Sequence, residues 1–378
     1  MSRRSLAVIG IAATAALAGC TSTAPTSGRA AGGGPITVNA ADASCELGAG
    51  EAPAGTISFA INNTGTKVTE FYLYGAGDRI MGEAENIGPG LTRQMIVEVP
   101  DGGSYITACK PGMVGDGIRG PFKVTGTATR SVDDNAKLAE ATAGYKRYIT
   151  SQIEALLPKT QEFADAVKKG DVAGAKALFP VSRTYWERVE PVAESFGDID
   201  PKVDGREDDQ RDPGVAFTGY HRLEKDLWVS GLQPDSGAIA DQLVVDMKDL
   251  QNRVKTVALT PVQLANGAKE LLDEVATGKI TGEEDRYSHT DLWDFKANIE
   301  GSQAALAALR PVIDEKQPAL GTTLDERFKA VDTLLERYRV GDGFRLYTEL
   351  TPDDVKKMTA AVDALGEPVS QVAGVVSS

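Results

Sequence analysis

The hydrophobic pattern of this chain changes near residue 130. Between residues 36 and 126, short stretches alternate apolar and polar residues, and Gly, Pro and Asn separate them. From Ser131 onward, apolar residues recur with the 3.6-residue period of helices. In a strand that faces a core the apolar residues recur every two residues, and in a helix they recur every 3.6 residues. The two patterns therefore indicate different secondary structures. The chain is therefore predicted to hold an all-β domain followed by an all-α domain.

The first domain, residues 35–127, is predicted to be a β-sandwich. Its strand candidates share period-two alternation and end in turn residues, at the spacing typical of sandwiches. They are residues 55–64, 71–75, 93–100, 103–109 and 121–126. About ninety residues of short strands agree with that fold.

The second domain, residues 131–378, is predicted to be a helical bundle, or two bundles side by side. The helix candidates are residues 134–157, 160–169, 172–195, 217–230, 236–256, 261–277, 291–313, 322–338 and 351–365. Their main breaks fall at Gly170, between Pro201 and Pro213, and at residues 341–343.

The N-terminus has the pattern of a secretory signal. Arg3 and Arg4 precede an apolar stretch, residues 6–18, that is too short for a comfortable membrane span, and Gly19-Cys20 follows. A cysteine at the cleavage point is typical of a bacterial lipoprotein, so residues 1–20 are predicted to be the signal, with Cys20 lipidated. The alternative is an ordinary signal with an incidental cysteine. Residues 21–34 are expected to be a flexible tether. The mature protein is expected outside the cytoplasm, in the periplasm or at the cell surface, lipid-anchored to the cell membrane.

Charge and cysteine content indicate which partners and which cysteine chemistry to expect. The 378 residues include 40 Lys and Arg against 54 Asp and Glu, a net charge of −14. This acidic balance argues against a nucleic-acid partner. In an oxidising compartment Cys45 and Cys109 are expected to form a disulfide that joins the first strand to a late one. Thiolate metal binding is the alternative.

Two helical motifs offer metal ligands. His221 and Glu224 are three residues apart, which places an imidazole and a carboxylate on one side of a helix. Glu187 and Glu190 have the same spacing on a preceding helix, and two such acids aimed inward repel each other unless a cation or a proton neutralises one. The alternatives are a local ion pair for His221 and a solvated helix face for the glutamates.

Two loops add further candidates. The acid-rich segment 196–207 contains Asp204, which offers an oxygen ligand. The segment 282–293 contains His289 and Asp291 just before a helix, where His289 either caps that helix or faces His221 across the bundle.

These segments resemble the imelysin-like domain of EfeO-family iron-uptake lipoproteins. The matching runs are Tyr-Trp-Glu187-Arg-Val-Glu190-Pro-Val-Ala-Glu, Gly-Tyr-His221-Arg-Leu-Glu224-Lys-Asp-Leu-Trp and Glu-Glu-Asp-Arg-Tyr-Ser-His289-Thr-Asp291-Leu-Trp-Asp-Phe. The resemblance covers roughly residues 130–378. The preceding domain, which ends in Ala108-Cys109-Lys-Pro-Gly-Met113, is similar to the cupredoxin-like domain that long family members carry first.

The resemblance implies that the chain binds iron outside the membrane and delivers it to an iron permease, with a haem peroxidase as a further partner. It places ligands at His221 and Glu224, an acidic pair at Glu187 and Glu190, and a loop acid at Asp204. Asp291 is an additional candidate. Ferric and ferrous iron are both open as cargo, and zinc or copper is expected to substitute in vitro. Carboxylates and an imidazole suit such ions.

The sandwich is not expected to hold type 1 copper, because residues 35–127 contain no histidine and such a site uses two. A second, carboxylate-only iron site is allowed by the resemblance. Its candidates are Glu70, Glu83, Glu85 and Glu98. The alternative is that these are ordinary surface acids.

The chain is not expected to be an enzyme, and no catalytic residue is assigned. A metallopeptidase would need a metal-bound water and a separate general base, as in the H-E-x-x-H helix, which this sequence lacks. A metal-bridged binder of polysaccharide or another ligand is the remaining alternative.

Overall fold

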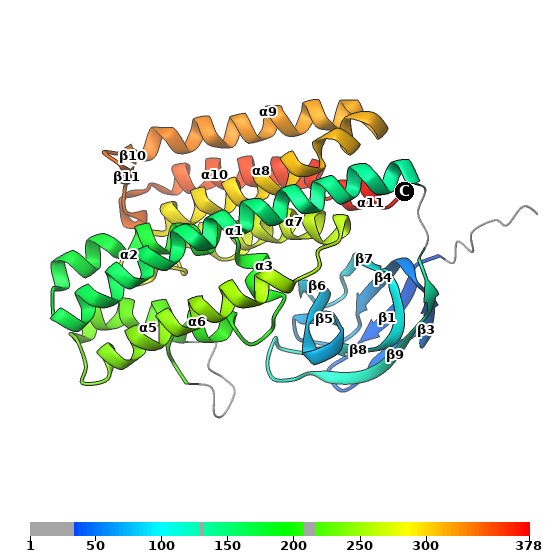
Figure 1. Cartoon of the computed structure of the whole chain (residues 1–378), viewed down its shortest axis with the longest axis horizontal. Helices are drawn as coiled ribbons and strands as arrows, with labels where there is room; N and C mark the ends of the chain where they lie inside the picture. Colours follow the sequence, from blue (N-terminus) through cyan, green and yellow to red (C-terminus); the bar gives the residue numbers. More distant parts are fainter. Residues whose placement is uncertain (1–33, 129–131, 208–215) are drawn as a thin grey trace, which may run out of the picture. The chain divides into compact units, whose positions relative to one another are not determined.

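The computed structural model describes residues 34–128, 132–207 and 216–378, and Pro35–Ser378 forms one compact unit (Figure 1). The predicted signal, the predicted lipidation site Cys20 and nearly all of the predicted tether lie outside the described residues. Among the described helices, none is long and apolar enough to cross a membrane.

The β-domain consists of nine strands in two sheets, and the fold class predicted from the sequence is confirmed. The strands are β1 (Ile36–Ala40), β2 (Cys45–Leu47), β3 (Glu51–Pro53), β4 (Gly55–Asn63), β5 (Thr69–Tyr74), β6 (Ile80–Ile87), β7 (Thr92–Val99), β8 (Asp101–Cys109) and β9 (Ile118–Thr127). A short 3₁₀ turn, η1 (Ala76–Asp78), precedes β6.

The two sheets enclose an apolar core. One has the order β2-β1-β4-β7 and the other β3-β9-β8-β5-β6; β1 pairs with β4 and β3 with β9 in parallel, and the other neighbours are antiparallel. Phe59 of the first sheet packs on Phe71 and Phe122 of the second, with ring centroids 5.2 and 5.5 Å apart. Phe59 and Phe122 alternate with more exposed neighbours along their strands, whereas β5, which carries Phe71, is buried along its whole length.

The predicted disulfide is confirmed, and it joins the sheets. Cys45 and Cys109 are bonded, with Cα atoms 5.6 Å apart. Cys45 lies on β2 rather than on the first strand, because β1 ends at Ala40 and turns back to pair with β2.

The second domain is all-helical, as predicted. Its helices are α1 (Val132–Lys169), α2 (Val172–Glu187), α3 (Glu190–Glu194), α4 (Asp200–Val203), α5 (Gly219–Lys225), α6 (Ser236–Thr256), α7 (Pro261–Thr277), α8 (Asp291–Lys316), α9 (Pro318–Leu335), α10 (Pro352–Val369) and α11 (Val372–Ser377). Short 3₁₀ or π segments and one two-stranded ladder join them: η3 (Asp226–Ser230), η4 (Lys279–Thr281), η5 (Glu336–Tyr338), η6 (Tyr347–Glu349), β10 (Arg339–Val340) and β11 (Gly343–Phe344).

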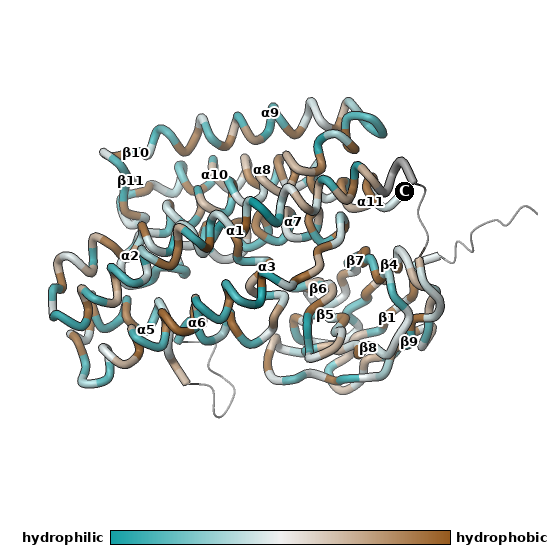
Figure 2. Tube along the Cα trace, viewed as in Figure 1, coloured by the Kyte–Doolittle hydropathy of each residue, from teal (hydrophilic) through white to brown (hydrophobic). Residues whose placement is uncertain are grey.

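A single apolar cluster runs through this domain. Helix α1 packs against α2, α6 and α8, while α7 packs against α8 and α10 (Figure 1). Brown, apolar stretches recur along these helices between teal, polar ones, which is the pattern of amphipathic helices around a shared core (Figure 2). The predicted bundle is thus one connected helical domain with a common core.

Several helix boundaries differ from the predicted ones, and three of these differences have a clear physical cause. Helix α1 continues through Pro158, where a break was expected. Buried Leu156 and Phe163 flank that proline, and their packing outweighs the one helical hydrogen bond that proline removes.

The predicted helix 172–195 ends instead at Glu187, and α3 begins at Glu190 with Pro191 in its first turn. Proline at that position lacks the N–H that would bond back to the carbonyl of Glu187, which favours a break there. The predicted helix 217–230 changes at Asp226 into a π turn, a feature that is frequent near functional sites.

Hydrogen bonds between described residues join the sandwich to the helical domain. Arg79 donates to the carbonyl of Ala258 (2.8 Å), the side chain of Asn266 donates to the carbonyl of Ile96 (2.8 Å), and the Ile80 N–H donates to the carbonyl of Ser195 (2.9 Å).

Candidate metal centre

The local fold brings four side chains from three separate segments to one buried point. Helix α5 supplies His221 and Glu224, the C-terminal end of α4 supplies Asp204, and the segment between η4 and α8 supplies Glu284. Gly219 makes this approach feasible: its φ is +75°, and a Cβ there would lie 2.1 Å from the carbonyl oxygen of Val203. Glycine is therefore required for α5 to start against the end of α4.

His221 is the centre of the group. It is 2% exposed. Its Nδ1 lies 3.0 Å from Glu224 Oε2, and its Nε2 lies 3.3 Å from both Asp204 Oδ1 and Glu284 Oε1. Three carboxylates thus surround one imidazole within hydrogen-bonding distance.

The surroundings favour the protonated imidazole. Burial and the Arg183 guanidinium oppose a charge on His221, but hydrogen bonds to Asp204 and Glu224 and the charge of Asp204 outweigh them and raise its pKa well above the usual range. Metals bind neutral imidazole, so a metal arriving here must displace a proton from His221.

Glu224 is oriented from both sides. Its Oε2 contacts His221, while its Oε1 accepts hydrogen bonds from the backbone N–H groups of Tyr287 (2.9 Å) and Ser288 (2.7 Å). The loop before α8 therefore fixes the carboxylate that the i, i+3 spacing places beside the imidazole.

Arg183, on α2, is the main counter-ion of the group. Its guanidinium is completely buried and contacts five carboxylates. They belong to Glu187, Asp204, Glu284, Asp285 and Asp294. Burial favours a neutral Asp204, but Arg183 and His221 outweigh it and hold the pKa of that carboxyl well below its usual range.

Glu187 and Glu190 meet a second buried cation. The Lys279 ammonium lies 2.5 Å from Glu187 Oε2, 2.9 Å from Glu190 Oε2 and 3.1 Å from Glu274 Oε2. Burial and the neighbouring Glu190 nevertheless raise the pKa of Glu187 to about 8, against the opposing effects of Lys279 and Arg183. The repulsion expected between these two glutamates is therefore met by an internal lysine.

Several sets of side chains are spaced so that one ion could be shared, each with ligand atoms within 4.8 Å of one another. Among the described residues these sets are Asp204–His221–Glu284, His221–Glu224–Asp285, Glu187–Glu190–Asp204 and Glu190–Glu194–Asp200. Asp204, His221 and Glu190 each belong to two sets. This connected region contains all five of the main ligands predicted from the sequence: Glu187, Glu190, Asp204, His221 and Glu224.

Asp291, the remaining predicted ligand, and His289, the second histidine, lie at the margin of this connected region. Asp291 accepts a hydrogen bond from the Asp285 N–H at 3.2 Å, and it belongs to none of the ion-sharing sets found in the described part of the chain. His289 is not among the described residues that pair with His221, and it lies just before α8 with a φ of +61°. The described residues do not pair the two histidines.

Sequence reasoning missed four residues of this region: Arg183, Lys279, Glu284 and Asp285. Arg183 carried a signal, since it precedes Glu187 by four residues on one helix, a spacing at which opposite charges pair. Glu284 and Asp285 stand in the acidic run before His289, whereas Lys279 had no local signal.

The structure separates the four glutamates predicted as a second iron site in the sandwich, because one of them lies in a different sheet from the other three. Glu70 and Glu85, from β5 and β6, both accept a hydrogen bond from the Tyr72 hydroxyl, at 3.0 and 2.9 Å. Glu83 is the cross-strand partner of Tyr72. Glu98 lies on β7 in the other sheet.

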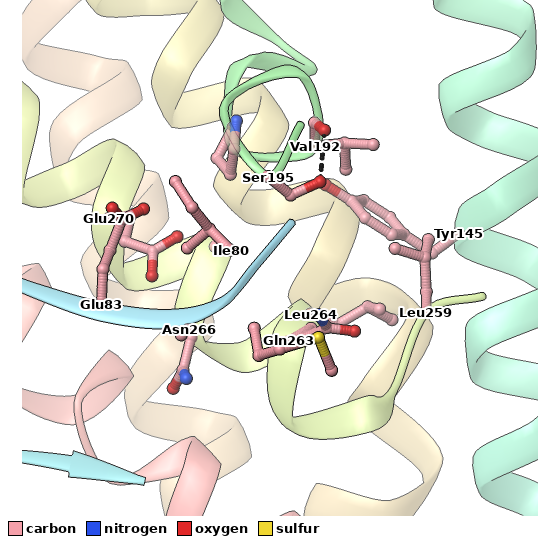
Figure 3. Close-up of a pocket in the computed structure, with 14 residues that line it drawn as sticks. Ile80, Glu83, Tyr145, Val192, Ser195, Leu259, Gln263, Leu264, Asn266 and Glu270 are labelled. Atoms are coloured by element: carbon pink, nitrogen blue, oxygen red, sulfur yellow. Dashed lines mark hydrogen bonds between the residues drawn. The ribbon is translucent and has the colours of Figure 1, made fainter. Parts of the chain in front are cut away.

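Glu83 faces the helical domain. Figure 3 shows its carboxylate beside that of Glu270 on α7, at a cavity of about 40 Å³ that Tyr145 and Ser195 also line. Burial and the nearby Glu85 raise the pKa of Glu270 to about 8. The sandwich and the helical domain therefore meet through carboxyl groups as well as through the three hydrogen bonds.

Comparison with known proteins gives the family. The Imelysin family profile matches residues 141–372, and the Cupredoxin-like domain profile matches residues 10–123. Iron uptake system component EfeO of Escherichia coli O157:H7 is 40% identical over 346 residues, covering 90% of this chain and 91% of that protein. The proteins of the same name from E. coli K12 and Shigella flexneri are 39% identical over the same lengths.

Domain order, helical motifs and overall similarity agree across nearly the whole described chain. The chain belongs to the EfeO family, with a cupredoxin-like domain followed by an imelysin domain.

Proposed function

We propose that this protein is an extracytoplasmic iron-binding component of an iron uptake system. It captures iron on carboxylates and a histidine in the helical domain and delivers it to a permease in the membrane. The observation that carries the proposal is the buried group in which Asp204, Glu224 and Glu284 all lie within 3.3 Å of the His221 ring nitrogens. The names of the relatives support iron as the cargo.

The donor set suits iron chemically. Iron in either oxidation state accepts carboxylate oxygen and imidazole nitrogen. Asp204 and Glu284 contribute most readily, because the pKa of each carboxyl is held below its usual range: burial opposes ionisation, but Arg183 and His221 outweigh it at Asp204, and Lys279 and His221 at Glu284. His221 and Glu224 complete the set, and Glu187 and Glu190 are adjacent to it.

The site supports binding and release rather than catalysis. Of the described acids nearest to His221, each is placed as a ligand or is held by Arg183, so none of them is positioned as a separate base for a metal-bound water. A metallopeptidase activity is therefore not proposed. Export with a lipid anchor at Cys20, and a haem peroxidase as a further partner, remain part of the proposal from the sequence.

The test is an iron titration of the soluble form that lacks residues 1–20, followed by calorimetry with and without oxygen. Tight binding that is lost in His221→Ala/Glu224→Ala supports the proposal. The matched control is His289→Asn/Glu283→Ala, which removes the other histidine and an exposed neighbouring acid. Equal binding by wild type and the His221 variant would move the site elsewhere, and no binding by either would favour a polysaccharide or another ligand.

Release is expected to be driven by protons. Because ligands bind metal in their deprotonated forms, affinity should fall between pH 7 and pH 4.5. An affinity that does not change over that interval would contradict release by acidification.

The sandwich provides a candidate second site on Glu70, Glu83 and Glu85, without Glu98. The shared Tyr72 hydroxyl holds two of these carboxylates on one face of the sheet. If this face binds iron, Glu70→Gln/Glu85→Gln should remove one ion per chain while the His221-dependent ion remains. An unchanged stoichiometry would make these residues ordinary surface acids.

A further inference from the structure

Lys279 is an unusual feature of the helical domain, because a lysine ammonium is rarely buried so completely. Its side chain is 2% exposed. The residue stands in η4, where the chain passes from α7 toward α8, and its side chain reaches the end of α2 and the start of α3. The charged ammonium of a lysine loses its hydration when it is buried. Hydrogen bonds and opposite charges must then offset the free energy that this costs.

Three carboxylates supply that compensation. The contacts with Glu187, Glu190 and Glu274, at 2.5, 2.9 and 3.1 Å, match the three N–H donors of an ammonium group. The ammonium therefore occupies a point on which three oxygen atoms from α2, α3 and α7 converge. A hard metal cation uses the same kind of oxygen cage.

This point adjoins the candidate iron site through one shared side chain. Glu187 Oε2 accepts from the Lys279 ammonium, and its Oε1 accepts from Arg183, which also binds Asp204. Glu187, Glu190 and Asp204 are close enough to share an ion. The lysine thus holds two carboxylates that the iron site could otherwise recruit.

Asn298 reinforces the arrangement from α8. Its side-chain amide donates to Glu187 Oε2 at 3.2 Å and to Glu190 Oε2 at 3.1 Å, so both glutamates are oriented toward Lys279 by a neutral group as well. Removing the lysine alone would leave these carboxylates in place and without their main counter-ion.

We propose that Lys279 is a built-in counter-ion that occupies a second cation position formed by Glu187, Glu190 and Glu274. By doing so it limits the helical domain to one iron ion and weakens the hold on that ion. The inference rests on the proposed function, since it concerns how tightly and how many times the same region binds iron. Its consequence is a site that binds iron without trapping it.

The test replaces the charge and keeps the length of the side chain. Lys279→Met, in the soluble form lacking residues 1–20, is titrated with ferrous iron under anaerobic conditions and followed by calorimetry. We expect one more ion per chain than in wild type. We also expect the first to bind at least ~10-fold more tightly, because one charge within about 4–6 Å changes proton affinity by roughly 10- to 1000-fold. Lys279→Arg, which keeps the charge, should behave as wild type.

The matched control is Lys269→Met on α7. Lys269 pairs with Asp273 at a partly exposed position on the same helix as Glu274, so its loss changes net charge equally without opening the cage. Equal gains in both methionine variants would reduce the effect to net charge and overturn the proposal.

A charge-balanced variant covers the case in which Lys279→Met does not fold. Lys279→Met/Glu274→Gln removes one positive and one negative charge, and it should bind a single iron ion more tightly than wild type. A purely structural lysine would lower stability in these variants and leave iron affinity unchanged or reduced, which would overturn the proposal.

The two proposals fail in different ways. If wild type binds no iron but Lys279→Met does, the counter-ion role stands and the proposed uptake function falls. If wild type binds iron and Lys279→Met binds the same number of ions with the same affinity, the uptake function stands and the counter-ion role falls. No binding by any variant would overturn both.

Discussion

The helical domain and the sandwich each gather carboxylates, but they balance the charge differently. In the helical domain, the buried cations Arg183 and Lys279 lie directly among the acids. On the sandwich, Glu70 and Glu85 share the hydroxyl of Tyr72, and Lys110 packs over the ring of that tyrosine, 4.1 Å from its centroid.

The extent of burial differs between the two groups: the five acids that contact Arg183 are all buried, whereas of the sandwich pair Glu70 is buried and Glu85 is exposed. A carboxylate taken out of water needs a fixed positive partner, whereas one at a surface is stabilised by solvent and by mobile ions. The helical domain therefore carries its own counter-ions, and removing them should have large effects. The corresponding changes in the sandwich should be small, and the disulfide should matter more there.

The largest effect is expected from Arg183→Leu. The substitution leaves five buried carboxylates without their shared cation, and it should lower the free energy of unfolding by about 3–5 kcal/mol. Urea unfolding followed by circular dichroism, which reports on both domains, measures this loss and that of the sandwich counterpart. The sandwich counterpart, Arg119→Leu, breaks a pair with the exposed Asp78 and should cost below ~1 kcal/mol. Similar losses for both would contradict the contrast between the two regions.

The next effect concerns the sandwich alone. Cys45→Ala/Cys109→Ala removes a disulfide that closes a loop of 64 residues, which should lower stability by about 3–4 kcal/mol. Hydrogen exchange followed by mass spectrometry should show faster exchange in β2 and β8. All three tryptophans, Trp186, Trp228 and Trp293, lie in the helical domain, so the fluorescence-detected transition should stay close to that of wild type. An equal shift in that transition would show that the domains unfold together.

A pH-dependent effect distinguishes buried from exposed acids. Burial, followed by the charge of Asp285, raises the pKa of Asp291 to about 8, whereas an unfolded aspartate titrates near ~3.9. Between these values the folded protein holds a proton that the unfolded chain has lost, so stability falls as pH rises.

From pH 5 to pH 7, metal-free wild type should therefore lose about 2 kcal/mol through Asp291, at up to ~1.4 kcal/mol per pH unit. Asp291→Asn should not show this loss, because the amide does not ionise. Urea unfolding at both pH values in EDTA measures the difference. Glu85→Gln on the sandwich should give a change of the same sign and smaller size, since the pKa of Glu85, raised by burial and by Glu70 to about 7, is closer to its usual value. A difference for Asp291→Asn that does not change with pH would rule out this linkage.

The smallest effect is expected from Lys110→Met. It removes a cation over the Tyr72 ring at a partly exposed place and should cost about 0.5–1 kcal/mol. Thermal unfolding followed by circular dichroism measures it. A loss as large as that of Arg183→Leu would mean that the sandwich also depends on a built-in counter-ion.

Periodicity predicted the fold class because burying one face of a strand or helix sets the spacing of apolar residues within that short segment. Alternation along 55–64 and helical spacing along 236–256 each expose one apolar face, and the structure uses both faces as expected. The continuous α1 was missed, because proline weakens a helix locally while the packing around Pro158 comes from distant helices.

The sequence by itself determined the order of domains, the cysteine pair, and the placing of His221 beside Glu224, because each follows from short-range spacing or from simple counting. The tertiary structure decided that Asp204 and Glu284 join them, that Glu98 lies in a different sheet from the other sandwich acids, and that Arg183 and Lys279 neutralise the region. Those outcomes depend on residues up to about a hundred positions apart meeting in a medium of low polarity. Such a medium requires each charge to find a partner, and only the complete fold shows which partner it finds.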